Sequence, residues 1–142
     1  MRTLCIDYGE KRIGLAVSDP LGLTAQGLPT LIRHDEKSDT LKLSEIINEK
    51  DVNEIVIGLP KNMNGTLGKK AEEALKFADF LKSKFSLPVH TVDERLSTVR
   101  AHRSMLEGDL SRKKRGKRVD MIAAQLILQG YLDSKSAKRM KE

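Results

Sequence analysis

Residues 2–19 read RTLCIDYGEKRIGLAVSD, and this stretch decides the fold. It contains two short runs rich in Ile, Leu and Val, at 2–7 and 12–19, joined by a connection that includes Gly9. Apolar runs of this length on either side of a short turn are typical of a β-hairpin. The sequence therefore predicts that the chain begins with two antiparallel strands.

Downstream, strand-like runs alternate with stretches of helical periodicity. In chain order the sequence predicts a bent third strand at 22–33, a helix at about 38–50 with Ser38 and Asp39 as possible caps, a strand at 54–58, a helix starting near Thr66, a strand at 88–92, a weaker helix at about 97–107 and a strongly apolar helix at about 118–133. A strand reached through a helical crossover lies parallel to its neighbour. We therefore expect an α/β fold with a mixed five-stranded sheet, three antiparallel strands followed by parallel ones, flanked by helices.

The composition is that of one globular domain. The chain has 142 residues, of which 39% are hydrophobic and 32% charged, so we treat 1–142 as a single domain. No run approaches the ~20 apolar residues of a membrane helix. The N-terminus reaches Asp7 too early for a secretory signal, which predicts a cytoplasmic protein without membrane contact. The single cysteine, Cys5, lies in the first apolar run and is expected to be a packed thiol.

Basic residues are concentrated in the last third of the chain. Residues 1–94 carry 13 Lys/Arg and 15 Asp/Glu, whereas residues 95–142 carry 13 and 5. A basic loop is predicted at about 109–118, before the last helix, with a C-terminal tail at about 134–142. Such a loop could bind several phosphates or simply be solvated. The candidate nucleic-acid-binding residues are Lys11, Arg12, Arg95, Arg112, Lys113, Lys114, Arg115, Lys117 and Arg118.

Aromatic residues make up only 4% of the chain, and there is no Trp. This argues against base stacking as the main mode of binding. Recognition of the shape or backbone of structured RNA or branched DNA is the better expectation.

Three acidic residues fall where the predicted fold would bring them together. Asp7 closes the first strand, and Glu94 follows the strand at 88–92. Ligands bind beyond the strand ends of sheets of this kind. Asp120 falls on the apolar stripe of the last helix, where a charge needs a partner.

Each acid also has an ordinary structural explanation. Asp7 could accept hydrogen bonds from the backbone of the turn. Glu94 could form a surface ion pair with Arg95. Asp120 could lie in the first turn of its helix and interact favourably with the helix dipole.

Taken together, the three carboxylates predict a metal site. Carboxylates within a few ångströms of one another repel strongly at low dielectric, and a divalent cation removes that conflict. Oxygen ligands suit Mg²⁺ or Mn²⁺, and two such ions ~4 Å apart can promote phosphodiester hydrolysis. One Cys and three scattered His do not make an ordinary zinc site, and the chain has no P-loop. We therefore expect one or two Mg²⁺ or Mn²⁺ ions, and a nuclease.

Four blocks of the sequence resemble the YqgF/RuvX family, in its order and spacing. They are 6–19, Gly58-Leu59-Pro60 with Asn64-Gly65-Thr66, Asp93-Glu94-Arg95-Leu96-Ser97-Thr98, and 119–124 with 128–132. The resemblance covers essentially the whole chain. It implies an RNase H-like fold, which Holliday-junction resolvases share, and processing of the 5′ end of pre-16S ribosomal RNA. Junction resolution is the other activity that it implies.

The resemblance maps the family's active-site acids to Asp7, Glu94 and Asp120. Resolvases of the RuvC type carry four acids, one of them from the central strand, whereas the strand here ends Gly58-Leu59-Pro60. This departure leaves the number of metal ions open.

Two other functions compete with the nuclease. An ATPase of the actin and sugar-kinase type has a similar first hairpin, but it closes two lobes on its nucleotide, and 142 residues supply one. A noncatalytic RNA-binding factor with the same fold stays open. A nuclease this small could also need a ribosomal precursor particle or a second copy of itself to place its substrate.

Overall fold

Five strands form one mixed sheet in the order β3-β2-β1-β4-β5. The computed structural model describes residues 2–62, 64–94 and 112–141. β1, β2 and β3 are antiparallel, whereas β4 and β5 run parallel to β1. The bounds are β1 (Arg2–Tyr8), β2 (Arg12–Ser18), β3 (Ala25–Ile32), β4 (Val52–Leu59) and β5 (Val89–Asp93). The predicted sheet is confirmed, and so is the irregular third strand, because the β2–β3 register shifts between Ile13 and Leu15.

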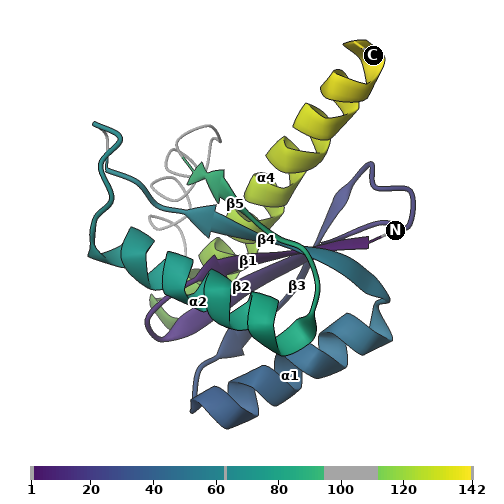
Figure 1. The fold of residues 1–142 in the computed structure, drawn as a ribbon. Helices are drawn as coiled ribbons and strands as arrows, with labels where there is room; N and C mark the ends of the chain where they lie inside the picture. The colour runs from purple at the N-terminus through teal and green to yellow at the C-terminus, as the bar shows by residue number, and fades with distance from the viewer. Residues whose placement is uncertain (1, 63, 95–111, 142) are drawn as a thin grey trace.

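Helices cover both faces of this sheet (Figure 1). α1 (Glu36–Glu49) and α2 (Lys69–Phe85) lie against one face, and α4 (Arg112–Lys141) lies against the other. Side chains alternate along a strand, so β1 contributes to two cores. Leu4 and Ile6 pack with α1 and α2, while Cys5 packs beneath α4. The central strand is thereby buried on both sides.

α4 is longer than the sequence predicted. It begins at Arg112 instead of near 118, and it continues to Lys141 instead of ending near 133. The prediction of a basic loop at 109–118 is therefore wrong from residue 112 onward, and the predicted tail at 134–142 is helical as far as 141. Lys and Arg are good helix formers, so a helix can extend past its packed segment without apolar residues. The helix predicted at 97–107 lies outside the described residues.

The caps predicted for α1 are also wrong. Its N-cap is Asp35, whose carboxylate accepts a hydrogen bond from the backbone N–H of Ser38 at 2.7 Å. Ser38 and Asp39 lie inside the helix, where Asp39 is buried and accepts a hydrogen bond from the backbone N–H of His34 at 3.0 Å. α2 begins at Lys69, slightly later than expected.

Glu54 on β4 fixes the C-terminal half of α4 to the sheet. Its Oε1 accepts hydrogen bonds from Thr3 Oγ1 and Lys135 Nζ, both at 2.8 Å, and its Oε2 accepts one from Tyr131 Oη at 3.2 Å. Partial burial acts to raise the pKa of Glu54. The hydrogen bonds from Lys135 and Thr3 outweigh that effect, so its pKa lies below the ordinary value.

None of the helices in the described ranges combines the length and the apolar character that crossing a membrane requires.

Candidate active site

The three acids singled out by the sequence line one cavity, of about 530 Å³. Its walls come from residues 7–12, from Pro60, from the first turns of α2 and from the acids Glu94 and Asp120. β1, β4 and β5 are parallel, so their C-terminal ends meet at one edge of the sheet. The structure therefore brings Asp7, Glu94 and Asp120 together, as expected.

Two glycines create the space that the acids occupy. Asp7 is paired with Gly14 across the β1–β2 hairpin, and Gly58 follows Ile57, the partner of Ile6. Because of this register, Gly14 and Gly58 lie on either side of Asp7.

Neither glycine can gain a side chain without disturbing an acid. A Cβ on Gly14 would overlap the backbone carbonyl of Asp120, and a Cβ on Gly58 would lie 2.9 Å from Oε1 of Glu94. The sequence contained both glycines within recognisable blocks, but only the strand register reveals that they flank Asp7.

Two of the three carboxylates are deeply placed. Asp7 is 9% exposed and Glu94 is 4% exposed. Their charges affect the neighbouring thiol. Complete burial is the main cause that raises the pKa of Cys5, and the negative charges of Asp7 and Glu94 raise it further. Cys5 is the packed, protonated thiol that the sequence predicted.

Asp120 is neutralised in part by Arg12. The Nε of Arg12 lies 2.7 Å from Oδ2 of Asp120, and the Asp120 side chain is 19% exposed. This ion pair joins the β1–β2 hairpin to α4 across 108 residues of sequence. Sequence reasoning placed Arg12 only among the nucleic-acid-binding candidates and missed the pairing.

The ordinary explanation for Asp120 does not hold, and the surface position expected of Glu94 is wrong. Asp120 lies in the third turn of α4, since the helix begins at Arg112, so it is not at the dipole end. Glu94 is buried and is not a surface residue. Its proposed partner Arg95 lies outside the described residues.

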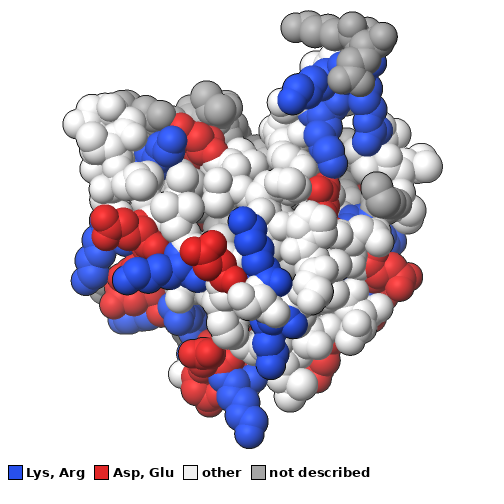
Figure 2. Space-filling view, viewed as in Figure 1, with Lys and Arg blue, Asp and Glu red and all other residues white. Residues whose placement is uncertain are grey.

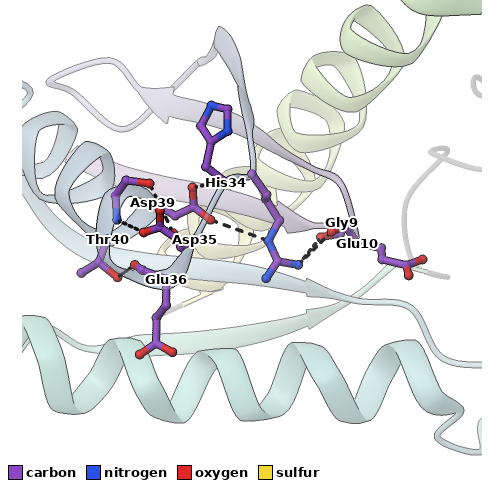
Figure 3. A network of polar contacts seen from close by, with 9 residues as sticks. Gly9, Glu10, His34, Asp35, Glu36, Asp39 and Thr40 are labelled. Carbon is purple, nitrogen blue, oxygen red and sulfur yellow. Dashed lines mark hydrogen bonds and ion pairs between the residues drawn. The ribbon is translucent and has the colours of Figure 1, made fainter.

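The turn between β1 and β2 is held by Arg33 (Figure 3). Nη1 of Arg33 donates hydrogen bonds to the carbonyls of Gly9 at 3.0 Å and Glu10 at 3.1 Å. The backbone N–H of Arg33 donates to the carbonyl of Lys11 at 3.0 Å. Three consecutive carbonyls of the turn thus bind one residue.

Two side chains hold the Arg33 guanidinium itself. Its Cζ lies 4.7 Å from the centre of the Tyr8 ring, and its Nε lies 3.9 Å from Oδ2 of Asp39. Arg33 therefore fixes the wall of the cavity that carries Lys11 and Arg12.

The cations that line the cavity are only partly those predicted to bind nucleic acid. Lys11 and Arg12 line it as expected, and Lys69 and Lys70 of α2 line it although they were not predicted. Arg118 is exposed, two residues before Asp120. Arg112, Lys113, Lys114, Arg115 and Lys117 belong to the first turns of α4 by their backbone. Figure 2 shows a further group of Lys and Arg side chains on the projecting end of α4.

The chemistry of the donors fits a hard divalent cation. All three predicted ligands are carboxylates, which Mg²⁺ and Mn²⁺ prefer. Across residues 2–62, 64–94 and 112–141, however, no three His, Cys, Asp or Glu side chains are grouped closely enough to form a finished metal site. Arg12 occupies one oxygen of Asp120, which accounts for part of that difference.

The sheet order, with acids at one edge of the sheet and on the helix that covers it, defines a class of protein, the RNase H-like fold of RuvC-type resolvases. The RuvC of Thermus thermophilus in complex with a Holliday junction substrate superposes with a TM-score of 0.59 at 16% identity, covering 95% of this chain and 96% of that chain. The fowlpox virus resolvase in complex with Holliday junction DNA gives 0.56 at 13% identity, covering 94% and 98%. At these identities the likeness concerns the fold.

Sequence relatives are much closer. Residues 1–134 match the RuvX family, described as Holliday junction resolvase, and the chain belongs to that family. A "Putative pre-16S rRNA nuclease" of Clostridioides difficile is 56% identical over 134 residues, which are 94% of this chain and 95% of that protein. A protein of the same name from Clostridium acetobutylicum is 54% identical, covering 94% and 99%. The predicted family and fold are confirmed.

Proposed function

We propose that this chain is a metal-dependent nuclease in which Asp7, Glu94 and Asp120 bind the metal and act at the scissile phosphodiester. The observation that carries the proposal is the meeting of these three acids, from β1, from the end of β5 and from α4, in one cavity. Two of them are buried, and a cation in the shared cavity would offset part of the cost of burying their charges.

The residues of the chain divide the work. Bound Mg²⁺ or Mn²⁺ supplies an activated water and stabilises the leaving oxygen. Asp7 and Glu94, fixed by burial, orient the attack from the floor of the cavity. Arg12 holds Asp120 in place and, with Lys11, contacts the phosphates of the substrate.

The substrate we propose is the 5′ region of pre-16S ribosomal RNA. The support is the name of relatives that share 54–56% of their residues with this chain over nearly their whole length. The second candidate is a four-way DNA junction, because the family is described as Holliday junction resolvase. Both are polyanions, which agrees with a cavity whose lining includes Lys11, Arg12, Lys69 and Lys70.

The test compares wild type with Asp7→Asn and Asp120→Asn on labelled precursor RNA and on a four-way DNA junction. Each reaction is run with Mg²⁺, with Mn²⁺ and with EDTA. Asp133→Asn is the matched control, because Asp133 is an exposed acid on the same helix as Asp120 and does not line the cavity.

Metal-dependent cutting by wild type and Asp133→Asn, lost in the other two variants, is the expected result. The preferred substrate then decides between RNA and junction. Tight binding without cutting by wild type would instead identify a noncatalytic RNA-binding factor. We do not expect a RuvX-family chain to bind ATP. Binding of ATP would support the competing function, an ATPase of the actin and sugar-kinase type.

We also propose that substrate placement needs a second protein surface, either a ribosomal precursor particle or a second copy of the chain. The support is the small size of the described cavity relative to a duplex or junction. Sedimentation with and without substrate tests the dimer. A monomer that is fully active alone contradicts both versions.

A further inference from the structure

We propose that Lys69 and Lys70, exposed at the start of α2, bind a backbone phosphate of the nucleic acid in the cavity that holds Asp7, Glu94 and Asp120. The proposal rests on the function proposed above and names residues of the substrate site that neither the sequence motifs nor the family assign.

The cavity has exposed cations beside its buried acids. Asp7 and Glu94 are buried in it, whereas Lys69 and Lys70 are exposed at its rim, together with the acids Glu10 and Glu73. A polyanion that approaches the acids is repelled unless cations receive its other phosphates first. The rim lysines are placed to do this.

The cations of the cavity come from two different elements. Lys11 and Arg12 belong to the connection between β1 and β2, whereas Lys69 and Lys70 belong to the start of α2. Cations from two elements can hold a strand at more than one phosphate, which limits its movement relative to the acids.

The two lysines are available for this role. Within the described residues, neither Lys69 nor Lys70 forms an ion pair with another side chain. Lys side chains contact phosphate as flexible point charges and read no sequence. The contact therefore raises affinity for any strand in the cavity and leaves base preference unchanged.

The test measures binding and cutting by Lys69→Gln/Lys70→Gln, which removes both charges and keeps most of the side-chain length. The control is Lys37→Gln/Lys42→Gln, which removes two exposed charges from α1, away from the cavity. Each contacted phosphate contributes about 0.7–0.9 to the slope of log K against log salt. We expect the slope to fall by about 1–2 in the α2 variant and to stay near the wild-type value in the control. KM should rise in the α2 variant while kcat stays close to that of wild type.

A substrate series locates the contact. Single neutral methylphosphonate linkages are placed at successive positions on either side of the cleavage site, and binding is measured in Ca²⁺ so that cutting does not interfere. One linkage on one side should weaken wild type but cause no further loss in Lys69→Gln/Lys70→Gln. If every linkage weakens the variant as much as it weakens wild type, or if the salt slope is unchanged, the proposal is wrong. If wild type itself binds no nucleic acid, the proposed function is wrong as well. This result separates failure of the proposed function from failure of the lysine contact alone.

Discussion

At the scale of single residues, the site depends on two glycines, which have no side chain to fill the space around Asp7. Gly14 and Gly58 flank Asp7 and leave room for Asp120 and Glu94. A glycine in a strand interior normally weakens the strand, because it adds chain entropy and no packing. Here the glycines cost strand stability, but they let the carboxylates of Asp120 and Glu94 come close to Asp7.

Gly58→Ala tests this arrangement. The added methyl group would lie 2.9 Å from Oε1 of Glu94 and 2.7 Å from Cδ1 of Ile127, so Glu94 must move. We expect kcat to fall about a hundredfold and the free energy of unfolding to fall by about 1–3 kcal/mol. Cleavage kinetics and urea unfolding measure the two effects separately.

Gly130→Ala is the control, because nothing lies within 4 Å of a Cβ at that helical position. It should stabilise the protein by about 1 kcal/mol and leave kcat unchanged. A wild-type kcat in Gly58→Ala would show that the position of Glu94 is not critical.

Arg33 acts on the site through the turn that it holds. Replacing it with Met removes hydrogen bonds to the carbonyls of Gly9 and Glu10. We expect the free energy of unfolding to fall by about 1–3 kcal/mol. We also expect KM to rise more than kcat falls, because Lys11 and Arg12 lose their fixed position.

Arg33→Lys is the companion variant, since it keeps a cation near Tyr8 but cannot reproduce the planar fork. It should recover part of the stability and little of the KM. If Arg33→Met destabilises the protein without changing KM, the turn has no role in binding.

At the scale of elements, α4 is attached to the sheet near both ends of its packed segment. The Arg12–Asp120 ion pair holds the end beside the cavity, and Glu54 holds the other end through Tyr131 and Lys135. Ala123, Ala124, Ile127 and Leu128 are buried between these two attachments. The helix therefore behaves as one rigid part of the site.

The attachment at Glu54 predicts a dependence of stability on pH. Despite partial burial, which acts to raise it, the folded pKa of Glu54 lies below the ordinary pKa of a glutamate, mainly because of the hydrogen bonds from Lys135 and Thr3, so its ionised form favours the folded state. That contribution is fully present above the unfolded pKa, and it is lost as pH falls through the folded pKa. We expect Glu54→Gln to lower the free energy of unfolding by about 1–3 kcal/mol at pH 7.

The difference between wild type and Glu54→Gln should shrink as the pH falls below the ordinary pKa of a glutamate, about 4.3, because the folded pKa lies lower still. Urea unfolding of both proteins from pH 7 to pH 3 measures it. Glu45→Gln, at an exposed position of α1, corrects for the general effect of removing a carboxylate. A difference that is constant over this range would contradict the role of the Glu54 charge.

At the scale of the whole molecule, metal binding should couple to folding. The acids of the site come from β1, from the end of β5 and from α4, so a cation bound by all three joins parts of the chain that are far apart in sequence. Ligand at a hundred times its dissociation constant stabilises a folded protein by about 2.7 kcal/mol.

We therefore expect Mg²⁺ or Mn²⁺ to raise the thermal midpoint of wild type and of Asp133→Asn relative to EDTA. The rise should be lost in Asp7→Asn. An equal rise in Asp7→Asn would place the cation elsewhere.

The sequence predicted those parts of the molecule that depend on local patterns. The first hairpin, the parallel strands and the burial of Cys5 follow from alternating or continuous apolar runs. The ends of α4 did not follow, because a helix rich in Lys and Arg has no apolar period to mark where it begins.

Contacts between distant residues account for the other differences. The acids were found individually from their places at strand ends and on a helix stripe. The Arg12–Asp120 pair joins residues that are 108 positions apart, and the side chain of Arg33 reaches back 24 positions to Gly9. No spacing rule connects such residues, and they become visible only in the assembled sheet.

The burial of Cys5 has a practical consequence for observing the site at work. It is the only cysteine in the chain, it is completely buried, and it packs beneath α4 next to Asp7. A thiol reagent can reach it only when α4 separates from the sheet, so the rate of labelling counts those separations. Intact-mass spectrometry would follow that rate without any change to the sequence, and a substrate or cation that closes the site would appear as slower labelling.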